Sequence, residues 1–100
     1  MNAREEEIIN GVVEILKRYL DVTCVILFGS RAKGNNGQGA DFDFAVNREK
    51  PQISLQRQIN EEIEKISGLY KVDIVYLLSV SKEFKDIILE TGKVVYEKRA

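Results

Sequence analysis

Two aspartates, Asp41 and Asp43, carry the clearest potential for chemistry in this sequence. Side chains two positions apart on a β-strand point to the same side, with Cα atoms about 6.5–7 Å apart, so both carboxylates could reach one or two ions. Asp73 lies in a later apolar run and could complete the cluster from a neighbouring strand. Two divalent ions roughly 3.5–4 Å apart would hold the attacking and leaving oxygens of a displacement at phosphorus. The alternative is that both aspartates lie on the wet face of a half-exposed strand and bind nothing.

A Gly-Ser pair, Gly29-Ser30, ends the apolar run that precedes these aspartates. Glycine would let the backbone approach a phosphate, and the Ser30 hydroxyl with backbone N–H groups at a helix start would bind its oxygens. An ordinary strand-ending turn is the alternative interpretation. The Walker loop is excluded because Asn35-Asn36 follows Gly34 where that loop needs Lys and Ser or Thr. The later glycines do not form G-x-G-x-x-G either, and they lead into a strand.

The amino-acid composition excludes several kinds of catalytic and metal site. The 100 residues include no histidine, which excludes Ser-His-Asp catalysis, Cys-His catalysis and histidine-ligated zinc. Carboxylates, lysine, arginine, serine and tyrosine remain. Because carboxylate oxygens favour hard cations, magnesium is the metal that we expect if one is bound.

Charge and hydropathy indicate the class of protein. The formal net charge is −1, with acids and bases interspersed, so direct nucleic-acid binding is not expected. No apolar run is long enough to span a membrane, and Arg4-Glu5-Glu6-Glu7 does not suit a signal peptide. The single cysteine, Cys24, allows no internal disulfide and suits a reducing compartment. We therefore expect a cytoplasmic protein.

Seven elements would position the candidate residues. Apolar side chains three and four residues apart predict helices, and β-branched or alternating runs predict strands. The predicted helices cover residues 2–20, 53–67 and 82–90, and the predicted strands cover 23–28, 41–46, 72–77 and 93–97. A short helical turn is expected at 30–33 and a loop at 35–39. Ser81 should cap the third helix, with Phe84, Ile87 and Ile88 facing inward, and Gly68 should end the second.

The order helix-strand-strand-helix-strand-helix-strand predicts a single α/β (α+β) domain over residues 1–100. Its small mixed sheet would be backed by helices. The second strand would place Asp41, Asp43 and Ala45 on one face and Phe42, Phe44 and Val46 on the other. The last strand is expected at a sheet edge because charged residues flank it.

The Gly-Ser turn, the D-x-D strand and the third aspartate together resemble the signature of the DNA polymerase β-like nucleotidyltransferase superfamily. The sequence is most similar to its minimal nucleotidyltransferase (MNT) family, over nearly the whole chain. The stretches that carry this resemblance are Leu27-Phe28-Gly29-Ser30-Arg31-Ala32-Lys33-Gly34, Asp41-Phe42-Asp43-Phe44-Ala45-Val46, Val72-Asp73-Ile74-Val75 and Ile88 to Glu97. One departure is Ala40, where the family commonly has serine.

The resemblance implies that ATP is the substrate. Gly29 and Ser30 would hold its triphosphate, and Arg31 would stabilise phosphate charge. Such a site works by alignment and charge neutralisation around the α-phosphate, with pyrophosphate leaving.

The resemblance also implies a metal site and a protein partner. Asp41 and Asp43 would bind two magnesium ions, and Asp73 would be the third ligand or the base that activates the acceptor hydroxyl. Many family members are encoded beside a helical HEPN-domain protein and act as the antitoxin of a toxin–antitoxin pair, and characterised systems transfer AMP to a tyrosine of that partner. A HEPN-type toxin is therefore the expected partner. A second copy of this chain, in a homo-oligomer, is the other way to supply an acceptor.

Three functional hypotheses remain open on the sequence. The first is a magnesium-dependent nucleotidyltransferase that modifies a hydroxyl of a partner protein. The second is a non-catalytic module that binds nucleotide or neutralises the partner by contact, since the chain is small and lacks an acceptor-binding domain. The third is a structural α/β domain with an accidental D-x-D, which requires the motif spacing, Asp73 and the closing segment to coincide.

Overall fold

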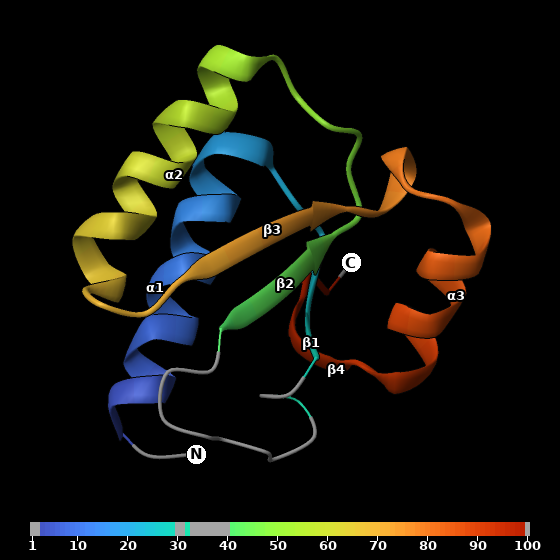
Figure 1. Ribbon diagram of the computed structural model, residues 1–100, viewed down its shortest axis with the longest axis horizontal. Coiled ribbons are helices and arrows are strands. Elements are labelled where there is room, and N and C mark those ends of the chain that lie inside the picture. The colour runs from blue at the N-terminus through green and yellow to red at the C-terminus, as the bar shows by residue number, and fades with distance from the viewer. Residues whose placement is uncertain (1–2, 30–31, 33–40, 100) are drawn as a thin grey trace.

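The computed structural model describes residues 3–29, 32 and 41–99 (Figure 1). Its helices and strands follow the expected order, with one additional short 3-10 helix. The elements are α1 (Ala3–Leu20), β1 (Cys24–Phe28), β2 (Phe42–Val46), α2 (Ile53–Ser67), β3 (Val72–Tyr76), the 3-10 helix η1 (Leu77–Ser79), α3 (Lys82–Thr91) and β4 (Lys93–Glu97). Among the described residues, no helix combines the length and the apolar character needed to cross a membrane.

The four strands form one mixed sheet in the order β3-β2-β1-β4. β1 pairs antiparallel with both β2 and β4, whereas β2 and β3 are parallel and are connected through α2. The predicted mixed sheet is therefore confirmed, and so is the edge position of β4. β3 forms the opposite edge, which places Asp73 at the rim of the sheet.

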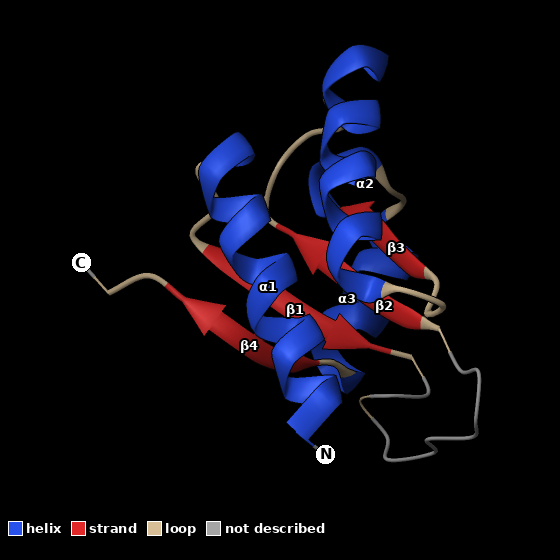
Figure 2. Cartoon of the chain, turned by 90° about the vertical axis from the view of Figure 1, so that its left-hand side faces the viewer, coloured by secondary structure: helices blue, strands red, loops and turns tan. Residues whose placement is uncertain are grey.

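Helices lie on both faces of the sheet. α1 and α2 pack together on one face, and α3 lies on the other (Figure 1). Figure 2 looks onto the face that carries α1 and α2. The main core fills the space under α1 and α2, where each fully buried large side chain contributes about 1.5–3 kcal/mol. Its fully buried side chains include Ile8, Val12 and Leu16 of α1, Ile59 of α2, Val25 and Leu27 of β1, and Phe42, Phe44 and Val46 of β2.

A smaller cluster lies between the sheet and α3. Ile26, Ala45, Leu77 and Ile88 are buried there. The residues of β2 are thus divided between the two faces as the alternating pattern predicts. Val75 of β3 packs against the smaller cluster but is only half-buried, which shows that α3 covers this face incompletely.

Local signals set the ends of α2 and α3. The Ser81 hydroxyl accepts a hydrogen bond from the Phe84 backbone N–H at 3.2 Å, which confirms the predicted N-cap. Gly68 ends α2 with φ +62°, in the left-handed region that favours glycine. Gly92 follows α3 and donates its backbone N–H to the Ile88 carbonyl at 2.8 Å.

Several details differ from the sequence prediction. β2 begins at Phe42, so Asp41 lies just before the strand and not in it. Leu77 belongs to η1 and not to β3, because the chain turns toward α3 at that point. Phe84 is 39% exposed and Ile87 is 56% exposed, although the helical pattern predicts that both face inward. A helix of ten residues over one part of the sheet buries only a narrow stripe of its own surface.

Candidate functional site

One end of the sheet brings the predicted aspartates together. β1 ends there at Phe28, and β2 and β3 begin there, because β2 runs antiparallel to β1 and parallel to β3. Asp43 lies directly opposite Phe28 of β1 on one side and opposite Asp73 of β3 on the other. Phe28, Asp43 and Asp73 therefore form a row across three strands.

This row lies on the face of the sheet that α3 covers. Residues paired directly across neighbouring strands have their side chains on the same face. Ala45 and Val75 lie two residues beyond the paired aspartates, and both belong to the smaller cluster, as does Phe28. Asp43 and Asp73 therefore project from the incompletely covered face and not into the main core.

Gly29 brings the turn after β1 against the carboxylate of Asp43. Its φ is +76°, in the left-handed region that glycine adopts without steric cost. A Cβ at this position would lie 2.6 Å from Asp43 Oδ2, closer than real Cβ atoms come to another atom. The missing side chain is what lets the backbone at Gly29 lie this close to the strand that carries Asp43.

The acidic side chains repel one another at this end of the sheet. Burial raises the pKa of the Asp43 carboxyl, and the negative charges of Asp73 and Asp41 raise it further. The Lys71 ammonium lowers the pKa of the same carboxyl, and its Nζ lies 3.9 Å from Asp73 Oδ2. Since these two side chains are 69% and 47% exposed, their ion pair contributes little by itself. A bound cation would relieve the remaining repulsion.

The three aspartates have the carboxylate oxygens that a magnesium site needs, but the described structure does not arrange them around one metal position. Carboxylate oxygens are the donors that a hard cation prefers. Within residues 3–29, 32 and 41–99, however, no group of three histidine, cysteine or acidic side chains is arranged to hold a metal ion. Sheet pairing aligns Asp43 with Asp73, whereas Asp41 precedes β2 and is half-buried. The three-aspartate metal site therefore stays a prediction.

The predicted nucleotide-binding residues are only partly described. Gly29 lies in the position given above, whereas Ser30 and Arg31 are outside the described residues. Ala40 and the expected loop at 35–39 are outside them too. Ala32, described between these segments, packs against the main core. The phosphate-binding role of the Gly-Ser turn stays a prediction.

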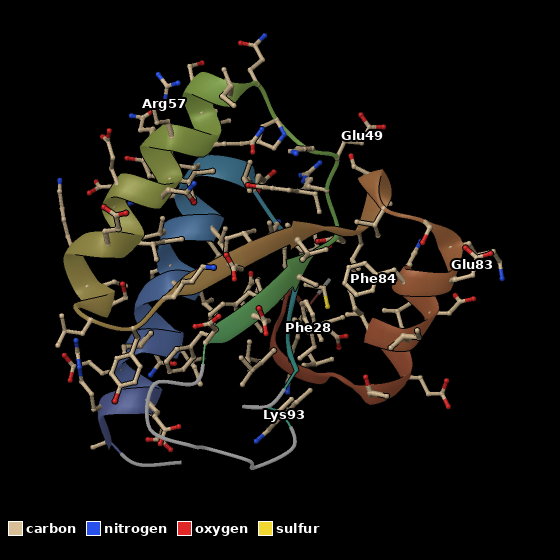
Figure 3. All side chains as sticks on the ribbon, in the orientation of Figure 1. Phe28, Glu49, Arg57, Glu83, Phe84 and Lys93 are labelled. Atoms are coloured by element: carbon tan, nitrogen blue, oxygen red, sulfur yellow. The ribbon has the colours of Figure 1, made fainter. Side chains whose placement is uncertain are left out.

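Three residues near the row have no role in the sequence prediction. Lys71 precedes β3 and offsets the acidic charge. Lys93 opens β4 at the same end of the sheet, opposite the end of β1 (Figure 3). The Phe28 ring meets Phe84 of α3 edge-on, with ring centroids 6.0 Å apart. The position of Lys71 beside an acidic strand is a signal in the sequence, but the other two depend on strand register and helix packing.

A cleft of about 530 Å³ lies away from the aspartates, between α2 and the start of β3. Glu64, Tyr70 and Lys71 are among its lining residues, and none of the three aspartates lines it. Since Ile63 and Val72 of this lining pack in the main core, the cleft lies on the α1–α2 side of the sheet. The candidate site is therefore the open carboxylate edge and not this cleft.

The sequence of this chain is similar to those of known proteins. The sequence model of a family described as "Polymerase beta, Nucleotidyltransferase" matches residues 10–100. The "Protein adenylyltransferase MntA" of Aphanizomenon flos-aquae is 38% identical over 96 residues, covering 85% of this chain and 63% of that protein. A Haemophilus influenzae protein named "Probable protein adenylyltransferase MntA" is 33% identical over 88 residues, covering 87% of this chain and 77% of that protein. The chain thus spans less than two thirds of the length of the first relative.

Solved structures share the fold. A crystal structure of a toxin-antitoxin with AMP-PNP aligns with a TM-score of 0.76 and 20% identity, over 91% of this chain and 74% of that one. A tri-AMPylated Shewanella oneidensis HEPN toxin in complex with MNT antitoxin gives a TM-score of 0.70 and 19% identity, over 94% and 73% of the two chains. At such identities the likeness establishes a common fold.

Proposed function

Because this chain belongs to the polymerase β nucleotidyltransferase family, we propose that it transfers AMP from ATP to a hydroxyl of a partner protein, with magnesium. The observation that carries this proposal is the close approach of Gly29 to Asp43. It brings a turn that suits phosphate oxygens next to a carboxylate that suits a metal ion. The direct pairing of Asp43 with Asp73 adds a second carboxylate beside the first.

The three aspartates would have two roles, metal binding and acceptance of a proton. Asp41 and Asp43 would hold magnesium, and Asp73 would be a third ligand or would accept the proton of the acceptor hydroxyl. Bound magnesium supplies positive charge that stabilises displacement at the α-phosphorus. Asp73 suits contact with an acceptor because it lies on the edge strand with 47% of its side chain exposed.

The other end of the site would hold the triphosphate. Gly29 and Ser30 would bind phosphate oxygens through backbone N–H groups and the serine hydroxyl, and Arg31 would stabilise the phosphate charge. Pyrophosphate would leave on this side.

We further propose that the partner is a HEPN-type toxin and that the acceptor is a tyrosine hydroxyl, which would make this chain the antitoxin of the pair. The name of the Aphanizomenon relative as a protein adenylyltransferase supports AMP transfer to protein. The tri-AMPylated HEPN toxin in complex with MNT antitoxin supports the class of partner.

Transfer of label from ATP that is labelled at its α-phosphate tests this proposal. With magnesium and the HEPN-type protein encoded beside it, the chain should move label onto that protein, and a chelator should stop the transfer. Asp43→Ala should lower the rate about 100-fold or more, because charge stabilisation at the reacting phosphate is lost.

Glu49→Ala is the matched control. Glu49 is exposed and lies at the end of the molecule away from the carboxylate edge (Figure 3), so its replacement should leave the rate unchanged. Absence of transfer by the wild-type chain, or equal transfer by Asp43→Ala, would refute the proposed activity.

A second function, neutralisation of the partner by contact alone, is favoured by one observation. The described residues do not assemble three carboxylates around a metal position. A variant with Asn at Asp41, Asp43 and Asp73 separates the two functions. If it binds the partner and restores growth of cells that express the partner as well as wild type does, contact suffices. If it binds but fails to restore growth, transfer is required.

A further inference from the structure

Two phenylalanines beside the carboxylates form an apolar wall. Phe28 lies opposite Asp43 in the sheet and directly before Gly29 in the chain. Phe84, in the first turn of α3, meets the Phe28 ring with centroids 6.0 Å apart and an interplanar angle of 81°. Figure 3 shows the Phe84 side chain reaching from α3 toward the sheet. We call this pair the aromatic wall.

The aromatic wall is more exposed than packing alone would favour. Phe84 leaves 39% of its surface in water, whereas Ile88, one turn further along α3, is fully buried. Phe28 and Val75, which pack against the same small cluster, are half-buried. Exposed apolar surface beside convergent polar groups is characteristic of ligand-binding sites.

We propose that the aromatic wall binds the purine base of the nucleotide. This inference rests on the proposed function, which places the triphosphate at Gly29. Aromatic side chains bind nucleic-acid bases by stacking, and they tolerate different bases because every base has a π-face. A single ribose links the base to the α-phosphate, so a base held at Phe28 keeps that phosphate close to Asp43, its partner across the sheet.

The placement of the aromatic wall favours the base over the ring of an acceptor tyrosine. The wall lies on the β1 side of Asp43, where α3 contacts the sheet and covers it in part. Asp73 lies on the other side of Asp43, on the edge strand β3. A partner protein can approach the open edge at β3, whereas α3 obstructs a protein on the β1 side and leaves access for a small molecule. The two substrates would thus reach Asp43 from opposite sides.

Calorimetric titration with ATP and with inorganic tripolyphosphate, both with magnesium, tests the inference. Tripolyphosphate carries the phosphates without a base. Phe84→Ala should weaken ATP binding about five- to tenfold, the effect of losing one stacking side chain, and leave tripolyphosphate binding unchanged. GTP binding should weaken by a similar factor in Phe84→Ala, because stacking does not distinguish one purine from another. Phe84→Trp should retain ATP affinity.

Ile87→Ala is the matched control, since Ile87 lies on the same helix and is 56% exposed. Ile87→Ala should change neither the affinity for ATP nor the affinity for tripolyphosphate. Circular dichroism of each variant verifies that α3 remains folded, and Phe84→Leu, which keeps an apolar side chain without a ring, should bind ATP as weakly as Phe84→Ala.

Three kinds of result would count against the inference. Equal ATP affinity in wild type and Phe84→Ala, or equal weakening of ATP and tripolyphosphate, would show that the aromatic wall does not bind the base. Unchanged ATP affinity with a raised KM for the acceptor protein would assign the wall to the acceptor. A wild-type chain that binds neither ATP nor tripolyphosphate would refute the proposed function itself, a result distinct from the first two.

Discussion

At the scale of single residues, the site depends on how closely Gly29 approaches Asp43. A left-handed φ and the absence of a Cβ let the turn after β1 lie against the Asp43 carboxylate. The same carboxylate is partly desolvated and faces Asp73 across the sheet, so its charge is poorly accommodated in the folded chain. The unfavourable charge of Asp43 weakens folding locally, as strained groups at functional sites commonly do.

Gly29→Ala should lose stability and transfer activity together. Alanine in the left-handed region costs about 1–2 kcal/mol, and its Cβ would lie 2.6 Å from Asp43 Oδ2. Thermal unfolding should show a Tm lower by roughly 4–8 °C or more for a domain of this size. A double-mutant cycle identifies the cause, because Gly29→Ala should cost less when Asp43 is already alanine. Equal costs in both backgrounds would show that the carboxylate does not limit the space.

Asp43→Asn should stabilise the metal-free chain while it abolishes transfer. The raised pKa of Asp43 means that the folded chain holds this proton more tightly than the unfolded chain does. Stability therefore falls as pH rises through this range, and the charged form stays unfavourable at neutral pH. Asparagine carries no charge, and the gain at neutral pH should be on the order of 0.5 kcal/mol after solvent screening.

Urea unfolding with a chelator at neutral pH, and again below the ordinary pKa of an aspartate, checks this prediction. The free energies of unfolding of wild type and Asp43→Asn should differ at neutral pH. They should converge in acid, where Asp43 is protonated in both the folded and the unfolded chain. A variant that is less stable than wild type at neutral pH would contradict the sign of the electrostatic argument.

At the scale of elements, strand register and the position of α3 decide which residues meet. Parallel pairing of β2 with β3 sets Asp43 against Asp73, and antiparallel pairing with β1 sets it against Phe28. α3 then closes one side of this row through Phe84. Its own position depends on a tight passage into β4 at Gly92.

Gly92→Ala should disrupt that passage. A Cβ at Gly92 would lie 2.6 Å from the Ile88 carbonyl oxygen and would collide with the Ile26 side chain. Because a backbone oxygen cannot move aside cheaply, the free energy of unfolding should fall by about 1–3 kcal/mol, the range for overpacked positions. Thermal unfolding measures the loss.

Gly11→Ala is the comparison variant for this prediction. Only the Ile66 side chain stands in the way of a Cβ at Gly11, and its flexible tip can move. Alanine also favours the helix by up to about 1 kcal/mol over glycine, so the stability should change little. Similar losses for both variants would contradict the assigned role of the Ile88 carbonyl.

At the scale of the whole molecule, the sheet is covered unevenly. α1 and α2 enclose one face and build the main core, whereas α3 covers only part of the other (Figure 1). Large apolar side chains therefore occupy one face, and carboxylates with partly exposed aromatic rings occupy the other. The open edge at β3 is where the proposed acceptor protein would approach.

Much of this architecture could be predicted from local patterns. The bounds of α2 and β4 agree with the sequence prediction, and each of the other predicted elements agrees at one end and differs by one residue at the other. Helical periodicity and strand alternation are properties of neighbouring residues, so a single sequence displays them. The prediction that Ile87 faces inward was wrong, because the width of the buried stripe on α3 depends on how much of the sheet lies beneath the helix.

The sequence by itself determined the residue types of the site, the family, and the alternation that puts Asp43 and Ala45 on one face of β2. Only the tertiary structure decided that Asp43 meets Asp73 and Phe28, that Gly29 lies against the Asp43 carboxylate, and that α3 brings Phe84 to the same place. Each of these contacts joins residues distant in the chain or depends on strand register. One slip in register would move every side chain of a strand to the other face, and no local pattern excludes such a slip as packing does.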